Sequence, residues 1–117
     1  MTYPEQRLQI TGYLKRLSHD APDTMKGFAA LHRAATDQSA LDVKTKELIA
    51  LSISVATRCD GCIAYHTHDA LKAGATREEV IDALGVAILM GGGPATIYAT
   101  HALKALDEFE PEFINTQ

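Results

Sequence analysis

Two cysteines, Cys59 and Cys62, are separated by two residues and are followed four residues later by His66. The thiolate is the reactive form of cysteine, and an unperturbed thiol with a pKa of about 8.5 is mostly protonated at neutral pH. Because residues four apart on a helix share a face, we expect His66 to lie beside Cys62 and exchange a proton with it. The spacing therefore indicates a redox-active dithiol.

The surrounding sequence places both sulfur atoms at the start of a helix. An apolar helical pattern is interrupted from Thr57 to Asp60, and a new one begins near Gly61. The unpaired N–H groups and the dipole of a helix N-terminus favour negative charge. Lowering a thiol pKa from about 8.5 to about 7 requires roughly 2 kcal/mol, which such a terminus and one further donor can supply. Asp60 acts in the opposite direction, because its carboxylate disfavours a nearby thiolate.

Other interpretations of the pair remain open. A disulfide closing a four-residue loop removes only about 2 kcal/mol of unfolded-state entropy, so a purely structural crosslink would be weak. A zinc site could use Cys59, Cys62 and His66, with His68 or His101 as a fourth ligand, although no second cysteine pair is present. Two inert buried thiols are a further alternative. Haem attachment is excluded, because that motif needs histidine directly after the second cysteine.

Length and charge limit the class of protein. A chain of 117 residues suits a single domain over 1–117. With 15 acidic and 11 basic residues the net charge is −4, and no basic cluster predicts contact with nucleic acid. We find no secretion signal and no apolar run of the roughly 20 residues that span a bilayer, so we expect a cytoplasmic protein without membrane contact. In that reducing compartment a close cysteine pair is more often catalytic, redox-sensing or metal-binding than a permanent crosslink.

The periodicity predicts an all-α fold, a compact bundle of about six helices. Helical patterns cover about 4–17, then start again at Pro22, near residues 42 and 61, at Arg77 and at Pro94. The last part of the fifth pattern, residues 84–90, is apolar almost all round, which favours cover by a partner subunit as well as by its own domain. The expected inward-facing positions include Leu8, Leu14, Leu17, Met25, Phe28, Leu31, Ile97, His101 and Leu106.

Local signals mark where helices end and begin. Gly74 suits the left-handed residue that closes a helix, and Thr76 with Glu79 forms a capping box at the start of the next one. The glycine run at 91–93 is not followed by the Lys-Ser/Thr of a phosphate loop, and no βαβ pattern surrounds it. We therefore predict no nucleotide, and no cofactor or resident metal.

Three stretches resemble a known family. They read ELIAL at 47–51, CDGCIAYH at 59–66, and AGAT at 73–76 followed by EEV at 78–80. Together they are similar to the core of the alkylhydroperoxidase D-like group, within the carboxymuconolactone decarboxylase family, and the similarity covers about 42–109. The family also includes decarboxylases that lack the cysteine pair, so the intact pair favours thiol chemistry over lactone decarboxylation.

The resemblance implies an all-helical protein that assembles into homo-trimers or homo-hexamers and reduces hydroperoxides. It implies that Cys62 attacks the peroxide, that Cys59 resolves the resulting sulfenic acid as a disulfide, and that His66 and Glu47 relay protons. It also implies a dithiol reductant, which in one family member is a lipoylated protein. The alternatives are a thiol-disulfide oxidoreductase acting on disulfide substrates, and a non-enzymatic redox sensor or zinc-stabilised module.

Geometry supports these assignments unequally. Glu47 lies about ten residues, or roughly 15 Å, before the end of its helix, whereas Cys62 to His66 covers only about 6 Å. A plain antiparallel pair of helices would keep Glu47 and His66 several ångströms apart. Contact between their side chains therefore needs a crossing angle, an early helix end or a bridging water. A helix-surface carboxylate is the alternative for Glu47. Tyr65 and His101 are further candidates for the lining of the site, with ordinary packing as their alternative.

Overall fold

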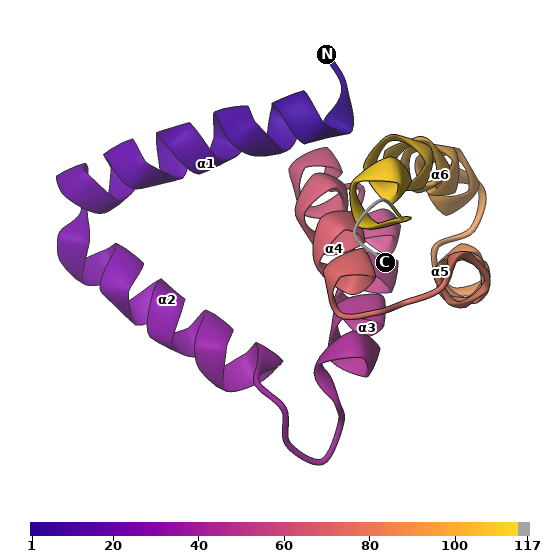
Figure 1. The fold of residues 1–117 in the computed structure, drawn as a ribbon, viewed down its shortest axis with the longest axis horizontal. Helices are drawn as coiled ribbons and strands as arrows, with labels where there is room; N and C mark the ends of the chain where they lie inside the picture. The colour runs from indigo at the N-terminus through magenta and orange to yellow at the C-terminus, as the bar shows by residue number, and fades with distance from the viewer. Residues whose placement is uncertain (115–117) are drawn as a thin grey trace.

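The computed structural model describes residues 1–114 and contains six α-helices over that range. No strand occurs among these residues, so the predicted all-α class is confirmed. Figure 1 shows that the last four helices form a helical body, from which the first two extend as an N-terminal arm. The helices are α1 (Tyr3–Asp20), α2 (Pro22–Thr36), α3 (Val43–Ala56), α4 (Asp60–Lys72), α5 (Arg77–Gly91) and α6 (Gly93–Ile114).

The helical body has one shared core. In it, α3 packs against α4 and α5, and α6 packs against the same two helices. Each of the four helices contributes side chains that are fully buried, which is the main source of stability in such a bundle. On α6 the expected inward position Leu106 is confirmed, whereas Ile97 is 60% exposed and that expectation is wrong. The largest fully buried side chains are Phe109, Leu51, Ile63, Leu106, Val55 and Val80.

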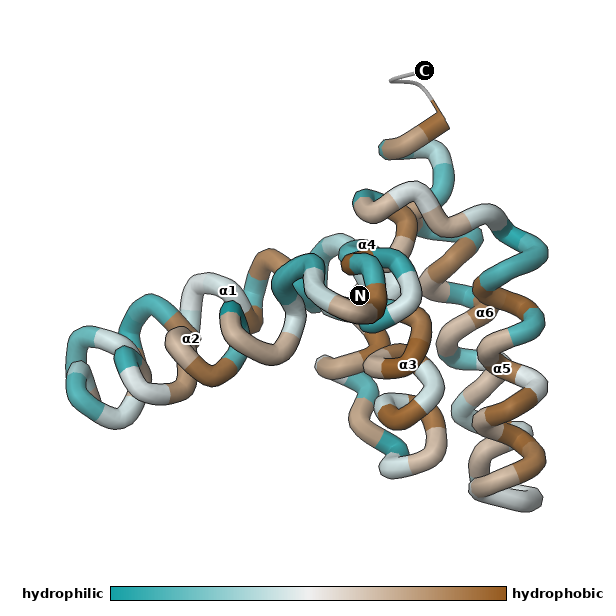
Figure 2. Tube along the Cα trace, turned by 90° about the horizontal axis from the view of Figure 1, so that it is seen from below, coloured by the Kyte–Doolittle hydropathy of each residue, from teal (hydrophilic) through white to brown (hydrophobic). Residues whose placement is uncertain are grey.

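The N-terminal arm contributes little to this core. Tyr3 is the one buried residue of α1, and α2 has none. Leu8, Leu14 and Leu17 are 69%, 39% and 47% exposed, so their prediction as core residues is wrong. Figure 1 shows the reason: α1 points away from the body after its first turns, and α2 runs back toward α3 without lying against α1. In Figure 2 the arm projects to one side of the body. Helical periodicity reports that a helix has an apolar face, but not what covers that face.

The ends of the helices follow the sequence signals. The hydroxyl of Thr76 accepts a hydrogen bond of 3.1 Å from the backbone N–H of Glu79, and the Glu79 carboxylate accepts one of 2.9 Å in return. Gly74 has φ of +96°, in the left-handed region that favours glycine. The predicted capping box and the predicted helix stop are both confirmed.

The end of α5 presents an apolar surface. Leu84 and Ala87 face the core, whereas Val86, Leu89 and Met90 are 57%, 79% and 77% exposed. The domain itself therefore covers only one side of this segment. Within residues 1–114, no helix combines the length and the apolar character that crossing a membrane requires.

Candidate active site

The connection between α3 and α4 places Cys59 at the start of α4. Arg58 adopts a left-handed backbone with φ of 59°. Its N–H donates to the carbonyl of Val55 at 3.1 Å, and the N–H of Cys59 donates to the carbonyl of Ser54 at 3.0 Å. This pair of bonds is the Schellman arrangement, which satisfies the last carbonyls of α3 and reverses the chain. Cys59 consequently becomes the N-cap residue of α4.

Cys59 and Cys62 form a disulfide across the first turn of α4. Their Cα atoms are 5.2 Å apart, a separation at which the two thiols join without movement of the backbone. The Cys59 Sγ also accepts a hydrogen bond of 3.3 Å from the backbone N–H of Cys62. Both sulfurs thus lie at a helix N-terminus, where the dipole favours a thiolate once the disulfide is reduced.

Glu47 and His66 contact each other across the interface between α3 and α4. The Nδ1 of His66 lies 2.7 Å from Oε2 of Glu47, and the Glu47 side chain is only 5% exposed. The helix bounds explain the contact. Glu47 is nine residues, or about 13.5 Å, before the end of α3, and His66 is six residues, or about 9 Å, after the start of α4. A glutamate side chain spans the small remaining difference, so neither an early helix end nor a bridging water is needed.

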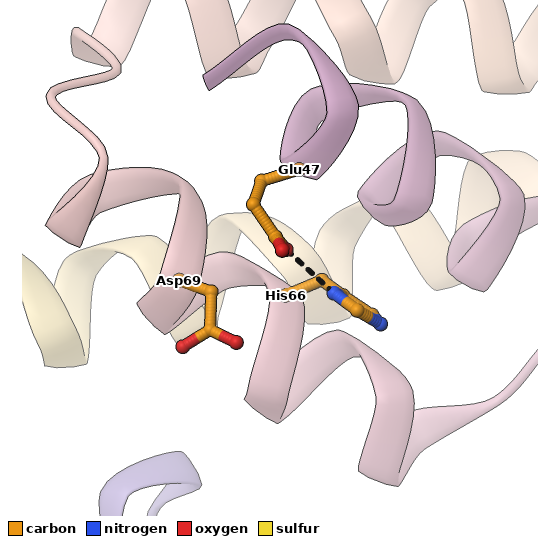
Figure 3. A group of neighbouring side chains, drawn as sticks. All are labelled: Glu47, His66 and Asp69. Atoms are coloured by element: carbon orange, nitrogen blue, oxygen red, sulfur yellow. Dashed lines mark hydrogen bonds and ion pairs between the residues drawn. The ribbon is translucent and has the colours of Figure 1, made fainter. Parts of the chain in front are cut away.

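Asp69 completes a group of three side chains that the sequence reasoning missed. One ligating atom from each of Glu47, His66 and Asp69 lies within 4.8 Å of the others. Figure 3 shows Glu47 reaching from α3 toward His66, with Asp69 one turn further along α4. The i, i+3 spacing of His66 and Asp69 was the available signal, because it places both on one face of a helix.

A pocket of about 420 Å³ lies over the cysteine pair. Its walls come from two separate parts of the fold, because α1 and α2 of the arm form one side and the start of α4 forms the other. The arm side is mainly apolar, and the α4 side carries the disulfide, the imidazole of His66 and the carboxylate of Asp69. The lining residues are Ile10, Leu14, Phe28 and His32 from the arm, and Cys59, Gly61, Cys62, Tyr65, His66 and Asp69 from the motif and α4.

Tyr65 and Gly61 join the arm to the motif. The Tyr65 hydroxyl hydrogen-bonds to Thr11 of α1, and the Arg7 guanidinium lies 5.2 Å from the centre of the Tyr65 ring. A Cβ at Gly61 would lie 3.0 Å from Cδ1 of Ile10, which is closer than side chains normally pack. Glycine at this position therefore lets α1 lie against the cysteine motif. Tyr65 lies in the wall of the pocket.

Asp60, between the two cysteines, is the centre of a second hydrogen-bond network. Its Oδ1 accepts a bond of 2.8 Å from the hydroxyl of Tyr3 and lies 3.0 Å from Nδ1 of His101. Burial, followed by the hydrogen bond to Asp60 and the charges of Asp60 and Glu108, raises the pKa of Tyr3 well above its ordinary value. The Tyr3 phenol therefore remains a donor. His101 lies against Asp60 rather than in the wall of the pocket.

The histidines considered as fourth zinc ligands lie elsewhere. The His68 ring packs edge-on against Phe109 and Phe113, with centroid separations of 5.5 and 5.2 Å. Its Nδ1 lies 2.8 Å from the carboxylate of Asp69. The Nδ1 of His101 lies 3.0 Å from Oδ1 of Asp60. Within residues 1–114 the group of potential metal ligands that lie together is Glu47, His66 and Asp69, and it includes neither the cysteines nor these two histidines.

Comparison with known sequences places these residues in a family. A model of the carboxymuconolactone decarboxylase family matches residues 22–105. An uncharacterized protein from Cupriavidus necator is 41% identical over 99 residues, which cover 85% of this chain and 88% of the relative. An uncharacterized protein from Haemophilus influenzae is 44% identical over 89 residues, which cover 76% of this chain and 79% of the relative.

Solved structures agree with the sequence comparison. A crystal structure of an apo carboxymuconolactone decarboxylase family protein from Legionella pneumophila has a TM-score of 0.89 and 46% identity, covering 92% of this chain and 96% of that one. A Thermotoga maritima family member, described as having a possible role in antioxidative response, has a TM-score of 0.85 and 32% identity, covering 94% of each chain. With its sequence, its fold and the matched residues in agreement, the chain belongs to the carboxymuconolactone decarboxylase family.

Proposed function

We propose that this protein is a dithiol-dependent peroxidase that reduces organic hydroperoxides. The observation that carries the proposal is the position of the Cys59–Cys62 pair, which caps a helix at one wall of a largely apolar pocket. The Glu47–His66 pair supports it, because His66 lines the same pocket as both cysteines. The description of the Thermotoga maritima relative concerns that protein alone, and it points in the same direction.

In the first step, the Cys62 thiolate attacks the terminal oxygen of a hydroperoxide ROOH. The O–O bond breaks, Cys62 becomes a sulfenic acid, and the departing alkoxide takes a proton to leave as the alcohol ROH. The cysteine is oxidised by two electrons and the peroxide is reduced by two. His66 is the proton donor in this step, because it lies one helical turn beyond Cys62.

In the second step, Cys59 attacks the sulfenic sulfur. The S–O bond breaks, the Cys59–Cys62 disulfide forms, and the sulfenic hydroxyl leaves as water after taking the proton of the Cys59 thiol. The Cα separation of 5.2 Å allows this without rearrangement of the helix. A small or protein-bound dithiol then restores the two thiols and is itself oxidised to a disulfide. A lipoylated protein is one such reductant.

Glu47 acts by positioning His66. The carboxylate accepts the Nδ1–H of the imidazole at 2.7 Å, which leaves Nε2 to exchange protons with the thiol and the leaving group. Because Glu47 is almost fully buried, its contact with His66 also avoids an unpaired carboxylate in the core. Asp60 and His101 lie behind the motif and influence the charge near the thiols without lining the pocket.

Assembly and location form part of the same proposal. The exposed apolar residues of α5 and of the arm support a homo-oligomer, a trimer or a hexamer. The proposed location is the cytoplasm, where dithiol reductants are available.

The test is turnover of cumene hydroperoxide by metal-free protein with a dithiol as the electron source. Turnover should be lost in Cys59→Ser and in Cys62→Ser and weakened in His66→Ala. His19→Ala is the matched control, because the His19 side chain is 91% exposed and lies on the arm. Turnover of an aromatic disulfide but not of the peroxide would instead favour a thiol-disulfide oxidoreductase. Stoichiometric oxidation without turnover would favour a redox sensor.

A further inference from the structure

Glu47, His66 and Asp69 form a three-membered group of metal-ligating side chains that does not involve the sulfurs. Ligating atoms of all three lie within 4.8 Å of one another. His66 and Asp69 are one turn apart on α4, and Glu47 approaches them from α3, as Figure 3 shows. Helical bundles commonly build metal centres in this way, from an i, i+3 pair on one helix and a carboxylate on the next.

The ligand types select a class of ion. One imidazole and two carboxylates suit a divalent first-row transition metal, and Zn²⁺ binds such sites more tightly than Mn²⁺ or Fe²⁺. Neighbouring ligand atoms around an ion with bonds of about 2.0–2.2 Å are about 3–3.5 Å apart. The Glu47–His66 contact of 2.7 Å must therefore open slightly, and Asp69 must approach the other two. Side-chain rotation is sufficient for both adjustments.

Charge and burial favour a cation at this position. Glu47 is 95% buried, and both carboxylates have histidines as their ion-pair partners within residues 1–114, without a lysine or arginine. Nδ1 of His68 lies 2.8 Å from Oδ1 of Asp69 and orients that carboxylate from outside the group. Hydrogen bonds of this kind are the usual support of a ligating carboxylate.

An ion can reach the group from the pocket over the dithiol. His66 and Asp69 both line that pocket, and their side chains are 22% and 27% exposed. The arrangement thus combines a buried anionic ligand, an imidazole, a supported second carboxylate and an access route. An exposed pair such as His19–Asp20 has none of these features except the imidazole and carboxylate themselves.

We infer that Glu47, His66 and Asp69 bind a divalent transition-metal ion, and that they hold Zn²⁺ more tightly than Mn²⁺ or Fe²⁺. The site does not require free thiols, and it therefore exists in the disulfide form of the protein. Bound metal removes the His66 imidazole from proton transfer and takes Glu47 from its contact with His66, so the ion inhibits the peroxide cycle. This last consequence rests on the proposed function, whereas the binding itself does not.

Calorimetric titration of Zn²⁺ into tag-free protein carrying Cys59→Ser and Cys62→Ser tests binding without any thiol ligand. We expect one ion per chain, and at least a tenfold loss of affinity in Asp69→Asn, added to the same background. Asp20→Asn is the matched control and should leave the affinity unchanged, because it alters an exposed His–Asp pair. Absence of saturable binding, or equal affinity in Asp69→Asn and its parent, overturns the inference.

A spectroscopic measurement identifies the ligands. Co²⁺ bound to the same thiol-free protein should give d–d absorption that disappears in Asp69→Asn and in His66→Ala, with the fold of each variant checked by circular dichroism. Chelator-reversible inhibition of the wild-type peroxidase by Zn²⁺ tests the consequence. Metal binding by a protein without peroxidase activity would refute the proposed function and leave the metal site in place. Peroxidase activity without metal binding would refute the metal site and leave the proposed function in place.

Discussion

The hydroxyl of Tyr3, at the start of α1, donates a hydrogen bond of 2.8 Å to the carboxylate of Asp60, which lies between the two cysteines. The backbone N–H of Tyr3 also donates to Glu108 of α6 at 2.8 Å. One buried residue therefore attaches the N-terminal arm to both the dithiol motif and the last helix. Because Tyr3 holds the arm through Asp60, the attachment of the arm and the charge near the thiols depend on the same carboxylate.

Tyr3→Phe should destabilise the protein by about 1.5–3 kcal/mol at neutral pH, because it removes one hydrogen bond to a charged group while keeping the buried ring. The raised pKa of Tyr3 adds a pH dependence. The native phenol keeps its proton above the ordinary pKa of 10.0, where the unfolded tyrosine loses it. This stabilisation is complete below pH 10 and declines as the pH rises toward the native pKa.

Urea unfolding at several pH values measures the effect. Wild-type protein should lose more stability than Tyr3→Phe as the pH rises above 10. Tyr13→Phe is the control, because the Tyr13 side chain is 61% exposed, and it should follow the wild type. Parallel curves for Tyr3→Phe and wild type would show that the phenol does not contribute to this dependence.

Asp60→Asn should make the reduced thiols more acidic, because it removes a negative charge from the first turn of α4. The same change should cost about 0.3–1 kcal/mol of stability, since an acidic residue at a helix N-terminus interacts favourably with the dipole. The rate of alkylation as a function of pH reports the thiol pKa. Asp107→Asn, which alters an ion pair with Arg77 away from the motif, should leave that profile unchanged. A shift to higher pH in Asp60→Asn would contradict the electrostatic argument.

Glu47→Gln should lower kcat for peroxide reduction while retaining the imidazole. Loss of a general acid–base group typically costs about 10²–10⁴-fold, so His66→Ala should fall in that range and Glu47→Gln should cost less. Steady-state kinetics on variants with native melting temperatures measure both. Glu78→Gln, on the exposed first turn of α5, is the control. Equal kcat in Glu47→Gln and wild type would exclude a positioning role for the carboxylate.

Phe28→Ala should reduce kcat/KM for cumene hydroperoxide by about three- to tenfold, because it removes apolar surface that an aromatic substrate would contact. Hydrogen peroxide makes no such contact, so its kcat/KM should stay the same. Phe28 is 59% exposed, and the substitution should hardly affect stability. Leu31→Ala is the control, since Leu31 is on the same helix, is 63% exposed and does not line the pocket. Equal losses for the two peroxides would indicate that the arm does not select the substrate.

Gly91→Ala and Gly85→Ala form a matched pair on α5 with opposite expected signs. A Cβ at Gly91 would lie 2.6 Å from that of Ala95, so Gly91→Ala should destabilise the body by about 1–3 kcal/mol. A Cβ at Gly85 meets no atom within 4 Å, so Gly85→Ala should stabilise α5 by about 0.5–1 kcal/mol. Thermal unfolding of the two variants measures both effects. A similar change in melting temperature for the two variants would show that neighbouring residues move to relieve the close contact between a Cβ at Gly91 and Ala95.

The sequence predicted the features that depend on local chemistry. Helix starts at Pro22 and Thr76, the stop at Gly74 and the placement of the cysteines at a helix N-terminus follow from neighbouring residues, and all are present. Leu8 is exposed although the periodicity predicts an inward position, because its environment depends on the direction in which α1 leaves the body, and no local signal sets that direction.

The candidate site was predictable to the extent that it lies on one helix. His66 follows from its spacing to Cys62, whereas the contact with Glu47 depends on how α3 and α4 are joined around Arg58. The i, i+3 spacing of Asp69 and His66 places both on one face of α4. That spacing indicates a shared site only once Glu47 of α3 is known to lie beside them. Residues that act together across an interface cannot be grouped from the pattern of either helix alone.

The two walls of the pocket differ in how strongly they are held. The wall formed by α4 belongs to the buried body, whereas the wall formed by α1 and α2 lies on the arm, in which Tyr3 is the one buried residue. Separation of the arm from the body therefore requires far less free energy than global unfolding. Thermal opening of that wall changes the width of the pocket while the dithiol keeps its place on α4. In amide hydrogen exchange, α2 should accordingly exchange by a partial opening reaction, ahead of the helices that hold the cysteines.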